Sequence, residues 1–175
     1  MAEYIQKAMR ARRSIREFTE QPVELELLEK IITAGIWAPS GLNNQPWRFI
    51  IIRDPEVGSR LSELTHYSHI VTAAPALIAV YLDQEKMYDP VKDHQAAGAC
   101  IQNMLLAACE LELGAVWLGQ ILKNKDKVNR ILQLDDQYDL MAIVALGYPR
   151  HRNQQSRRLP LKDFILDNLG GTTDP

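Results

Sequence analysis

Three short segments carry the side chains that could do chemistry. The first, RRSIR from Arg12 to Arg16, concentrates guanidinium groups and one hydroxyl, Ser14, over five residues. Several such donors suit a dianionic phosphate, because each charge-assisted hydrogen bond contributes about 1.5 to 3 kcal/mol. A solvated basic turn or a weak RNA-binding patch would also explain these residues taken alone.

The second segment, PSGLNNQPW from Pro39 to Trp47, places a hydroxyl and three side-chain amides between two prolines. Its donors and acceptors could bind the edge of a heterocycle from a rigid loop. An ordinary turn, in which the Asn side chains bond to their own backbone, is the alternative.

The third segment, GAVWLGQ from Gly114 to Gln120, encloses a short apolar element between two glycines. Glycine lets the backbone approach a flat ligand closely, and exposed amides near Gly119 could then donate hydrogen bonds. A helix cap followed by an edge strand would give the same pattern.

Other catalytic classes lack their motifs in this chain. His66, His69 and His94 have no carboxylate at complementary ligand spacing, so we predict no metal site. The two cysteines, Cys100 and Cys109, lie in one apolar stretch and are interpreted as buried packing residues. The sequence contains no dinucleotide-binding glycine motif, no P-loop and no G-x-S-x-G elbow.

Composition points to one ordinary globular domain. The chain has 175 residues, of which 46% are apolar and 24% charged. A net charge of −2 gives no bulk field that would attract nucleic acid. Without a long apolar run or a signal-like amino terminus, we expect no membrane contact and a cytoplasmic location.

Hydrophobic periodicity predicts the elements that must position these segments. We expect helices over 2–11, 24–37, 55–66, 91–113 and 125–134, and strands over 47–52, 76–82, 116–118 and 140–146. Gly114 is predicted to cap the long helix, and Trp37 and Trp47 are predicted core anchors. The resulting fold class is an α+β sheet covered by helices.

In this order, RRSIREF, APSGLNNQPWRF, GAVWLG and VALGYP followed by a late arginine resemble the nitroreductase family of FMN-dependent NAD(P)H oxidoreductases. The resemblance spans residues 10 to 160. It implies a mostly antiparallel central sheet wrapped by helices, in an intertwined homodimer with two FMN sites at the interface. The whole chain, 1–175, is then one FMN-binding domain, whose tail from about 150 extends over the surface or onto the partner subunit.

The same resemblance implies three groups of flavin contacts. For the phosphate and ribityl chain these are Arg12, Arg13, Ser14, Arg16 and, from the tail, Arg158. The partner subunit is expected to line the ring edge with Pro39, Ser40, Gly41, Asn43 and Gln45. Beside the ring we expect Trp117, Leu118 and Gly119, with a backbone amide near flavin N5, and His66 or His69 near the pyrimidine edge.

The implied reaction takes hydride from NADH or NADPH through FMN to a small acceptor, such as a nitroaromatic or a quinone, by a ping-pong mechanism. The protein would supply no catalytic acid, base or nucleophile. Alternatives are a non-catalytic flavin-binding or flavin-storage protein, and a specialised family reaction such as dehalogenation or flavin fragmentation. We also expect an isolated protomer to expose both the 39–47 loop and the apolar face of helix 91–113.

Overall fold

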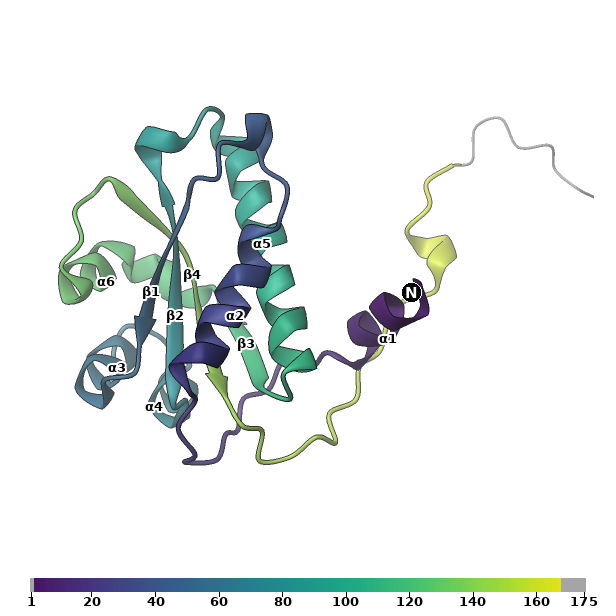
Figure 1. Cartoon of the computed structure of the whole chain (residues 1–175), viewed down its shortest axis with the longest axis horizontal. Helices are drawn as coiled ribbons and strands as arrows, with labels where there is room; N and C mark the ends of the chain where they lie inside the picture. Colours follow the sequence, from purple (N-terminus) through teal and green to yellow (C-terminus); the bar gives the residue numbers. More distant parts are fainter. Residues whose placement is uncertain (1, 168–175) are drawn as a thin grey trace, which may run out of the picture.

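A four-stranded antiparallel sheet forms the centre of the protein (Figure 1). The computed structural model describes residues 2–167, with side chains from Tyr4 onward. The strands are β1 (Trp47–Ile52), β2 (Ala76–Asp83), β3 (Gly114–Leu118) and β4 (Tyr138–Gly147), arranged in the order β1-β2-β4-β3. This confirms the predicted fold class, and it leaves β3 at one edge of the sheet.

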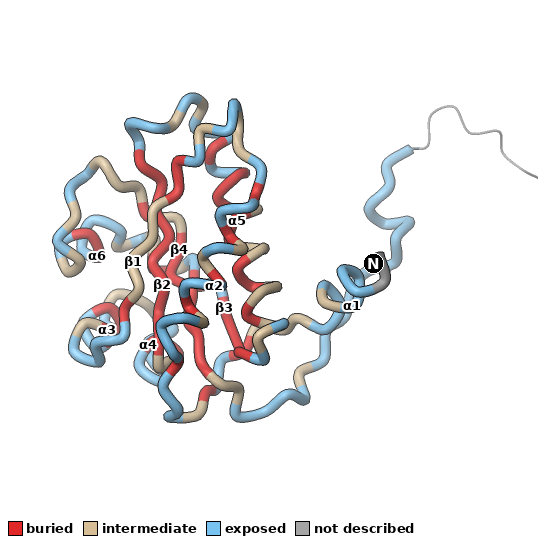
Figure 2. Tube along the Cα trace, in the orientation of Figure 1, coloured by how far each residue is buried: buried red, intermediate tan, exposed pale blue. Residues whose placement is uncertain are grey.

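Helices cover both faces of the sheet. On one face lie α2 (Leu25–Ile36) and α5 (Pro90–Glu110), and on the other lie α3 (Pro55–Ser62), α4 (Ser68–Ala73) and α6 (Lys125–Leu132) (Figure 1). The central strand β2 is therefore buried along its whole length (Figure 2), which explains why its sequence is a continuous apolar run rather than an alternating one.

The predicted helices exist, but two helix ends differ from the prediction by three residues or more, and one helix was not predicted. The helix expected over 55–66 ends at Ser62, and α4, which we did not predict, follows it. The long helix ends at Glu110 rather than at 113. Gly114 does not cap it, because Glu112 takes the left-handed conformation (φ 60°) and Gly114 already belongs to β3.

Gly114 is required instead by a close approach. A Cβ atom at this position would lie 2.6 Å from Cγ2 of Ile15, a buried side chain. We expect Gly114→Val to destabilise the fold by about 1–3 kcal/mol through overpacking, measured as a lower midpoint of urea unfolding. Gly58→Ala in α3 is the matched control, because a Cβ there meets nothing within 4 Å. An unchanged midpoint for Gly114→Val would contradict this account of the contact.

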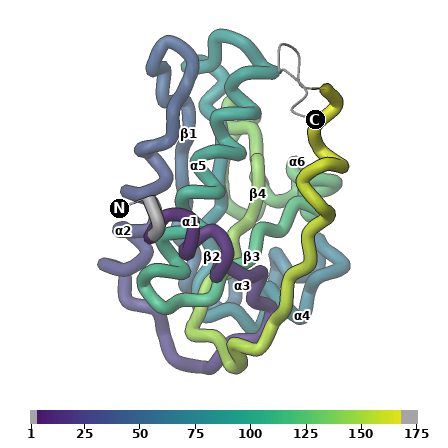
Figure 3. Tube along the Cα trace, turned by 90° about the vertical axis from the view of Figure 1, so that its right-hand side faces the viewer, coloured from purple at the N-terminus to yellow at the C-terminus, as the bar shows by residue number. Residues whose placement is uncertain are grey.

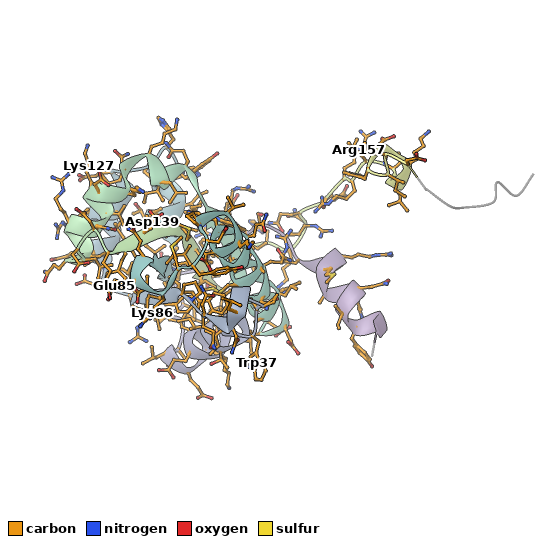
Figure 4. All side chains as sticks on the ribbon, turned by 90° about the horizontal axis from the view of Figure 1, so that it is seen from above. Trp37, Glu85, Lys86, Lys127, Asp139 and Arg157 are labelled. Atoms are coloured by element: carbon orange, nitrogen blue, oxygen red, sulfur yellow. The ribbon has the colours of Figure 1, made fainter. Side chains whose placement is uncertain are left out.

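Burial corrects three further predictions. Trp47 is buried as expected, but Trp37 is 83% exposed and is not a core anchor (Figure 4). Cys100 is buried, whereas Cys109 is only partly buried. The apolar face of α5 is covered within the protomer, since Ile101 and Met104 are fully buried in the cluster that α5 forms with α2 and the sheet.

Apolar side chains are exposed elsewhere, on segments that leave the body of the molecule. Helix α1 (Ala2–Ala11) and the tail beyond Arg150 both project from the same side (Figures 1 and 3). Exposed apolar side chains on these two segments are Tyr4, Ile5, Met9, Leu159, Leu161, Phe164, Ile165 and Leu166. A second molecule or another part of the chain is needed to cover them.

Candidate functional site

The arginine segment runs along the free edge of β3. Ser14 forms a parallel bridge with Ala115, and the Ile15 amide donates to the Ala115 carbonyl at 3.1 Å. Burial of Ile15 against Gly114 holds this pairing in place. Within the described sheet no strand pairs with the outer edge of β3 beyond Ala115, so backbone groups there are open to a ligand.

The three arginines of this segment differ in their surroundings. Arg13 donates to the carbonyl oxygens of Arg10, Arg12 and Gln154, so in this conformation it ties the turn to the tail. Arg16 donates to the Ser14 carbonyl at 3.4 Å. Within residues 2–167, the Arg12 guanidinium has no hydrogen bond or ion pair, so it is free to pair with an anionic ligand.

A second group of arginines, Arg150, Arg152, Arg157 and Arg158, begins beside the arginine segment. Phe18 bridges Pro149, and the Arg150 amide donates to the Glu17 carbonyl at 3.0 Å, so the root of the tail lies next to the arginine segment. The tail then leaves the body, as the position of Arg157 shows (Figure 4). No hydrogen bond of the described chain joins Arg158 to the segment; its guanidinium donates to Ser156 Oγ and the Arg157 carbonyl.

At the other end of β3, Gly119 leads into the 3-10 turn η3 (Gln120–Asn124). The Gln120 side-chain oxygen accepts from Thr65 Oγ1 at 2.7 Å and from the His66 amide at 3.0 Å. These bonds bring Thr65 and His66, here called the His66 region, to the end of β3, next to Gly119. Sequence reasoning missed Thr65 and Gln120, because nothing in either pattern indicates a side-chain bond across 55 positions.

The 39–45 loop is an ordered, strained turn. Leu42, Asn43 and Gln45 all have positive φ (52°, 55° and 48°), a conformation that costs a side-chain-bearing residue free energy. The Gln45 amide donates to Ser40 Oγ at 3.1 Å. The sequence allowed two interpretations, a loop that binds the edge of a heterocycle or an ordinary turn whose amides bond to the chain itself. Each describes only part of the loop, because the Gln45 side chain bonds to the Asn43 carbonyl whereas the Asn43 side chain is exposed.

A buried carboxylate anchors this loop to α5. Asp93 is 0% exposed and accepts from Asn44 Nδ2 at 2.8 Å, from the Tyr88 amide at 2.9 Å and from the Asp89 amide at 3.0 Å. Burial raises the pKa of Asp93, but these hydrogen bonds outweigh it and hold the pKa below its ordinary value. The carboxyl group is therefore ionised at neutral pH.

One protomer does not bring all the predicted site residues together. The 39–45 loop is fastened near the amino end of α5, whereas Ile15 and Gly114 lie beyond its carboxyl end. The helix has 21 residues, so its length is about 31 Å. The arginine segment, β3 and the His66 region form one group of residues, and the loop forms a second, separate group.

Trp117 borders a cavity between α5 and the start of β4. The cavity measures about 410 Å³ and is lined by His94, Gly98, Lys125, Asp139 and Met141 in addition to Trp117. Asp139 pairs with Lys125 Nζ at 2.8 Å, and His94 Nε2 lies 3.6 Å from the same carboxylate. The charged groups at this cavity are thus already paired.

The described residues offer neither a metal-binding cluster nor a helix that could cross a membrane. No group of three or more His, Cys, Asp or Glu side chains in this part of the chain could hold a metal ion. No helix among the described residues has both the length and the apolar character needed to cross a membrane.

Comparison with known proteins decides the family. The model of the Nitroreductase family matches residues 9–68 and 55–148, which together run from α1 to the end of β4. The chain belongs to the nitroreductase family. This confirms the resemblance seen in the four sequence motifs, which fall within the matched range except for Pro149 and the late arginine.

Individual members of the nitroreductase family align over most of the chain. It is 34% identical over 146 residues to a protein of Methanothermobacter thermautotrophicus described as an NADH dehydrogenase/NAD(P)H nitroreductase, covering 82% of this chain and 76% of the relative. It is 30% identical over 187 residues to an NADH dehydrogenase of Thermus thermophilus, covering 89% and 91%. A solved structure from Desulfovibrio desulfuricans, described as a nitroreductase in complex with FMN, has 49% identity and a TM-score of 0.89, covering 94% and 96%.

Proposed function

We propose that this protein is an FMN-dependent NAD(P)H oxidoreductase that acts as a homodimer and reduces small acceptors such as nitroaromatics or quinones. One observation carries the proposal: the free edge of β3 has the arginine segment at one end and Gly119 with the His66 region at the other. The FMN complex of the similar Desulfovibrio structure and the nicotinamide-dependent names of the relatives support it.

The dimensions of this edge fit FMN. At about 3.3 Å per residue, the chain from Ala115 in β3 to Gly119 just beyond the strand extends about 13 Å. Arg12, which has no partner within the described residues, would bind the phosphate beside Ala115, together with Ser14. The ribityl chain would follow β3, and the ring would lie beside the backbone of Leu118 and Gly119.

The second subunit would supply the 39–45 loop. In its own protomer this loop lies at the far end of α5 from β3, so it can reach only the flavin bound at β3 of another copy. The loop residues that would contact that flavin are Pro39, Ser40, Gly41, Asn43 and Gln45. Two exposed apolar side chains, Trp37 next to this loop and Leu42 within it, support contact with a second copy. The tail would extend onto the partner in the same assembly, where Arg158 could approach the phosphate.

The chemistry is assigned to the cofactor rather than to side chains. Bound FMN supplies the hydride-transfer chemistry, accepting from NADH or NADPH and reducing the acceptor. The residues of the chain would bind the cofactor and orient the donor and the acceptor. None of the residues at the site is needed as an acid, base or nucleophile. Donor and acceptor would use the same open face in turn, which gives ping-pong kinetics.

An absorbance spectrum after FMN addition and desalting tests this proposal, followed by anaerobic addition of NADH and then NADPH. We expect retained flavin bands that bleach with at least one nucleotide and recover on addition of a quinone. Retained flavin that neither nucleotide bleaches would overturn the reductase assignment in favour of flavin storage or a specialised reaction. Loss of all flavin on desalting would contradict the assignment of the site.

A further inference from the structure

Asp93 is a buried carboxylate that links α5 to the 39–45 loop. It lies in the first turn of α5, is fully buried, and uses both carboxylate oxygens. One oxygen accepts from Asn44 in the loop, and the other accepts from the amides of Tyr88 and Asp89. A buried charge is costly to desolvate, and the three hydrogen bonds that offset this cost come from the 39–45 loop and from the turn before α5.

The Asn44 side chain has only one workable orientation. Its Nδ2 donates to Asp93 Oδ1 at 2.8 Å and to the Lys86 carbonyl at 2.9 Å. Both partners are acceptors, so a flipped amide would place oxygen against oxygen on both sides. Asn44 therefore fixes the loop backbone between its neighbours Asn43 and Gln45, both of which have positive φ.

Tyr88 fastens the same loop from the other side. Its amide is held by Asp93, and its ring lies so close to Gly41 that a Cβ there would be 2.0 Å from Tyr88 Cε1. Asp93 thus holds both the Asn44 side chain and the Tyr88 backbone against one loop. With these bonds broken, three residues with positive φ would relax toward more favourable conformations.

We infer that Asp93 is a positioning residue for the flavin site of the partner subunit: it holds the 39–45 loop, through Asn44 and Tyr88, in the shape that binds the ring edge. The inference rests on the function proposed above. The amino end of α5 in one protomer would thereby shape the flavin site that lies on β3 of the partner subunit.

Asp93→Asn tests this directly. The substitution replaces one acceptor oxygen by an NH2 donor, which must face either the Asn44 NH2 group or the two backbone N–H groups, and all of these are donors. We expect the dissociation constant for FMN, measured by quenching of flavin fluorescence, to rise by about 10- to 100-fold. Because the loop binds the ring rather than the phosphate, the dissociation constant for riboflavin should rise by the same factor. This equal loss is a signature that a defect in the phosphate site would not produce.

A control variant separates positioning from a general loss of helix stability. Asp54→Ala removes the side-chain cap of α3, which accepts from the Glu56 amide at 2.8 Å, outside α5 and the 39–45 loop. It should lower the unfolding midpoint and leave flavin affinity near the wild-type value.

The outcomes distinguish this inference from the proposed function. If the wild-type protein binds no FMN, the proposed function fails. If it binds FMN and Asp93→Asn binds equally well, or if Asp54→Ala loses as much affinity, the inference about Asp93 is wrong. Should Asp93→Asn not fold, Asn44→Ala cuts the same bond from the partly exposed loop, and unchanged affinity in that variant would equally overturn the inference.

Discussion

Arg12→Ala is expected to weaken FMN binding by about 10- to 100-fold, the effect of losing one charge-assisted hydrogen bond to a phosphate. Arg12 is the appropriate target because Arg13 is already engaged with three backbone carbonyls, whereas Arg12 has no partner within the described residues. A fluorescence titration of the flavin-free apoprotein with FMN measures the change.

Riboflavin provides the matched ligand for this experiment. It lacks only the phosphate, so its affinity should be the same in wild-type protein and in Arg12→Ala. Arg60→Ala is a protein control, because Arg60 is an exposed residue in the last turn of α3, outside the arginine segment, β3 and the 39–45 loop. If Arg12→Ala weakens riboflavin and FMN equally, Arg12 supports the fold of the site and does not bind the phosphate.

Mixed dimers should recover a flavin site from two defective chains. Arg12→Glu places a negative charge at the phosphate, and Asn43→Pro is incompatible with the φ of 55° at that position, since proline requires a φ near −65°. Each variant alone should retain little FMN. In a heterodimer, one site combines the intact arginine segment of one chain with the intact loop of the other, and only the second site carries both defects.

Co-expression with two different affinity tags yields this heterodimer for measurement. We expect it to retain about half of the wild-type flavin per subunit after desalting, because one of its two sites is intact. Sequential purification on both tags excludes either homodimer from the sample. Flavin content as low as in the two homodimers would mean that the loop and the arginine segment act in the same subunit, or that the chain does not pair in this way.

The elements that were read correctly from the sequence are those whose pattern is local. The apolar run of β2 and the amphipathic pattern of α2 follow from which faces must be buried, and a short window contains that information. The four motifs were found for the same reason, because each consists of adjacent residues. Errors arose where a choice depends on distant contacts: Glu112 rather than Gly114 takes the left-handed position, and Trp37 faces outward.

Sequence alone thus determined the fold class, the family and the residue types available for a flavin phosphate, because these depend on composition, periodicity and contiguous motifs. Only the tertiary structure showed that the arginine segment pairs with β3, that Gln120 holds the His66 region beside it, and that Asp93 anchors a loop at the opposite end of α5. These contacts join residues that are far apart in the sequence, so they depend on how the whole chain packs and not on local conformational preference.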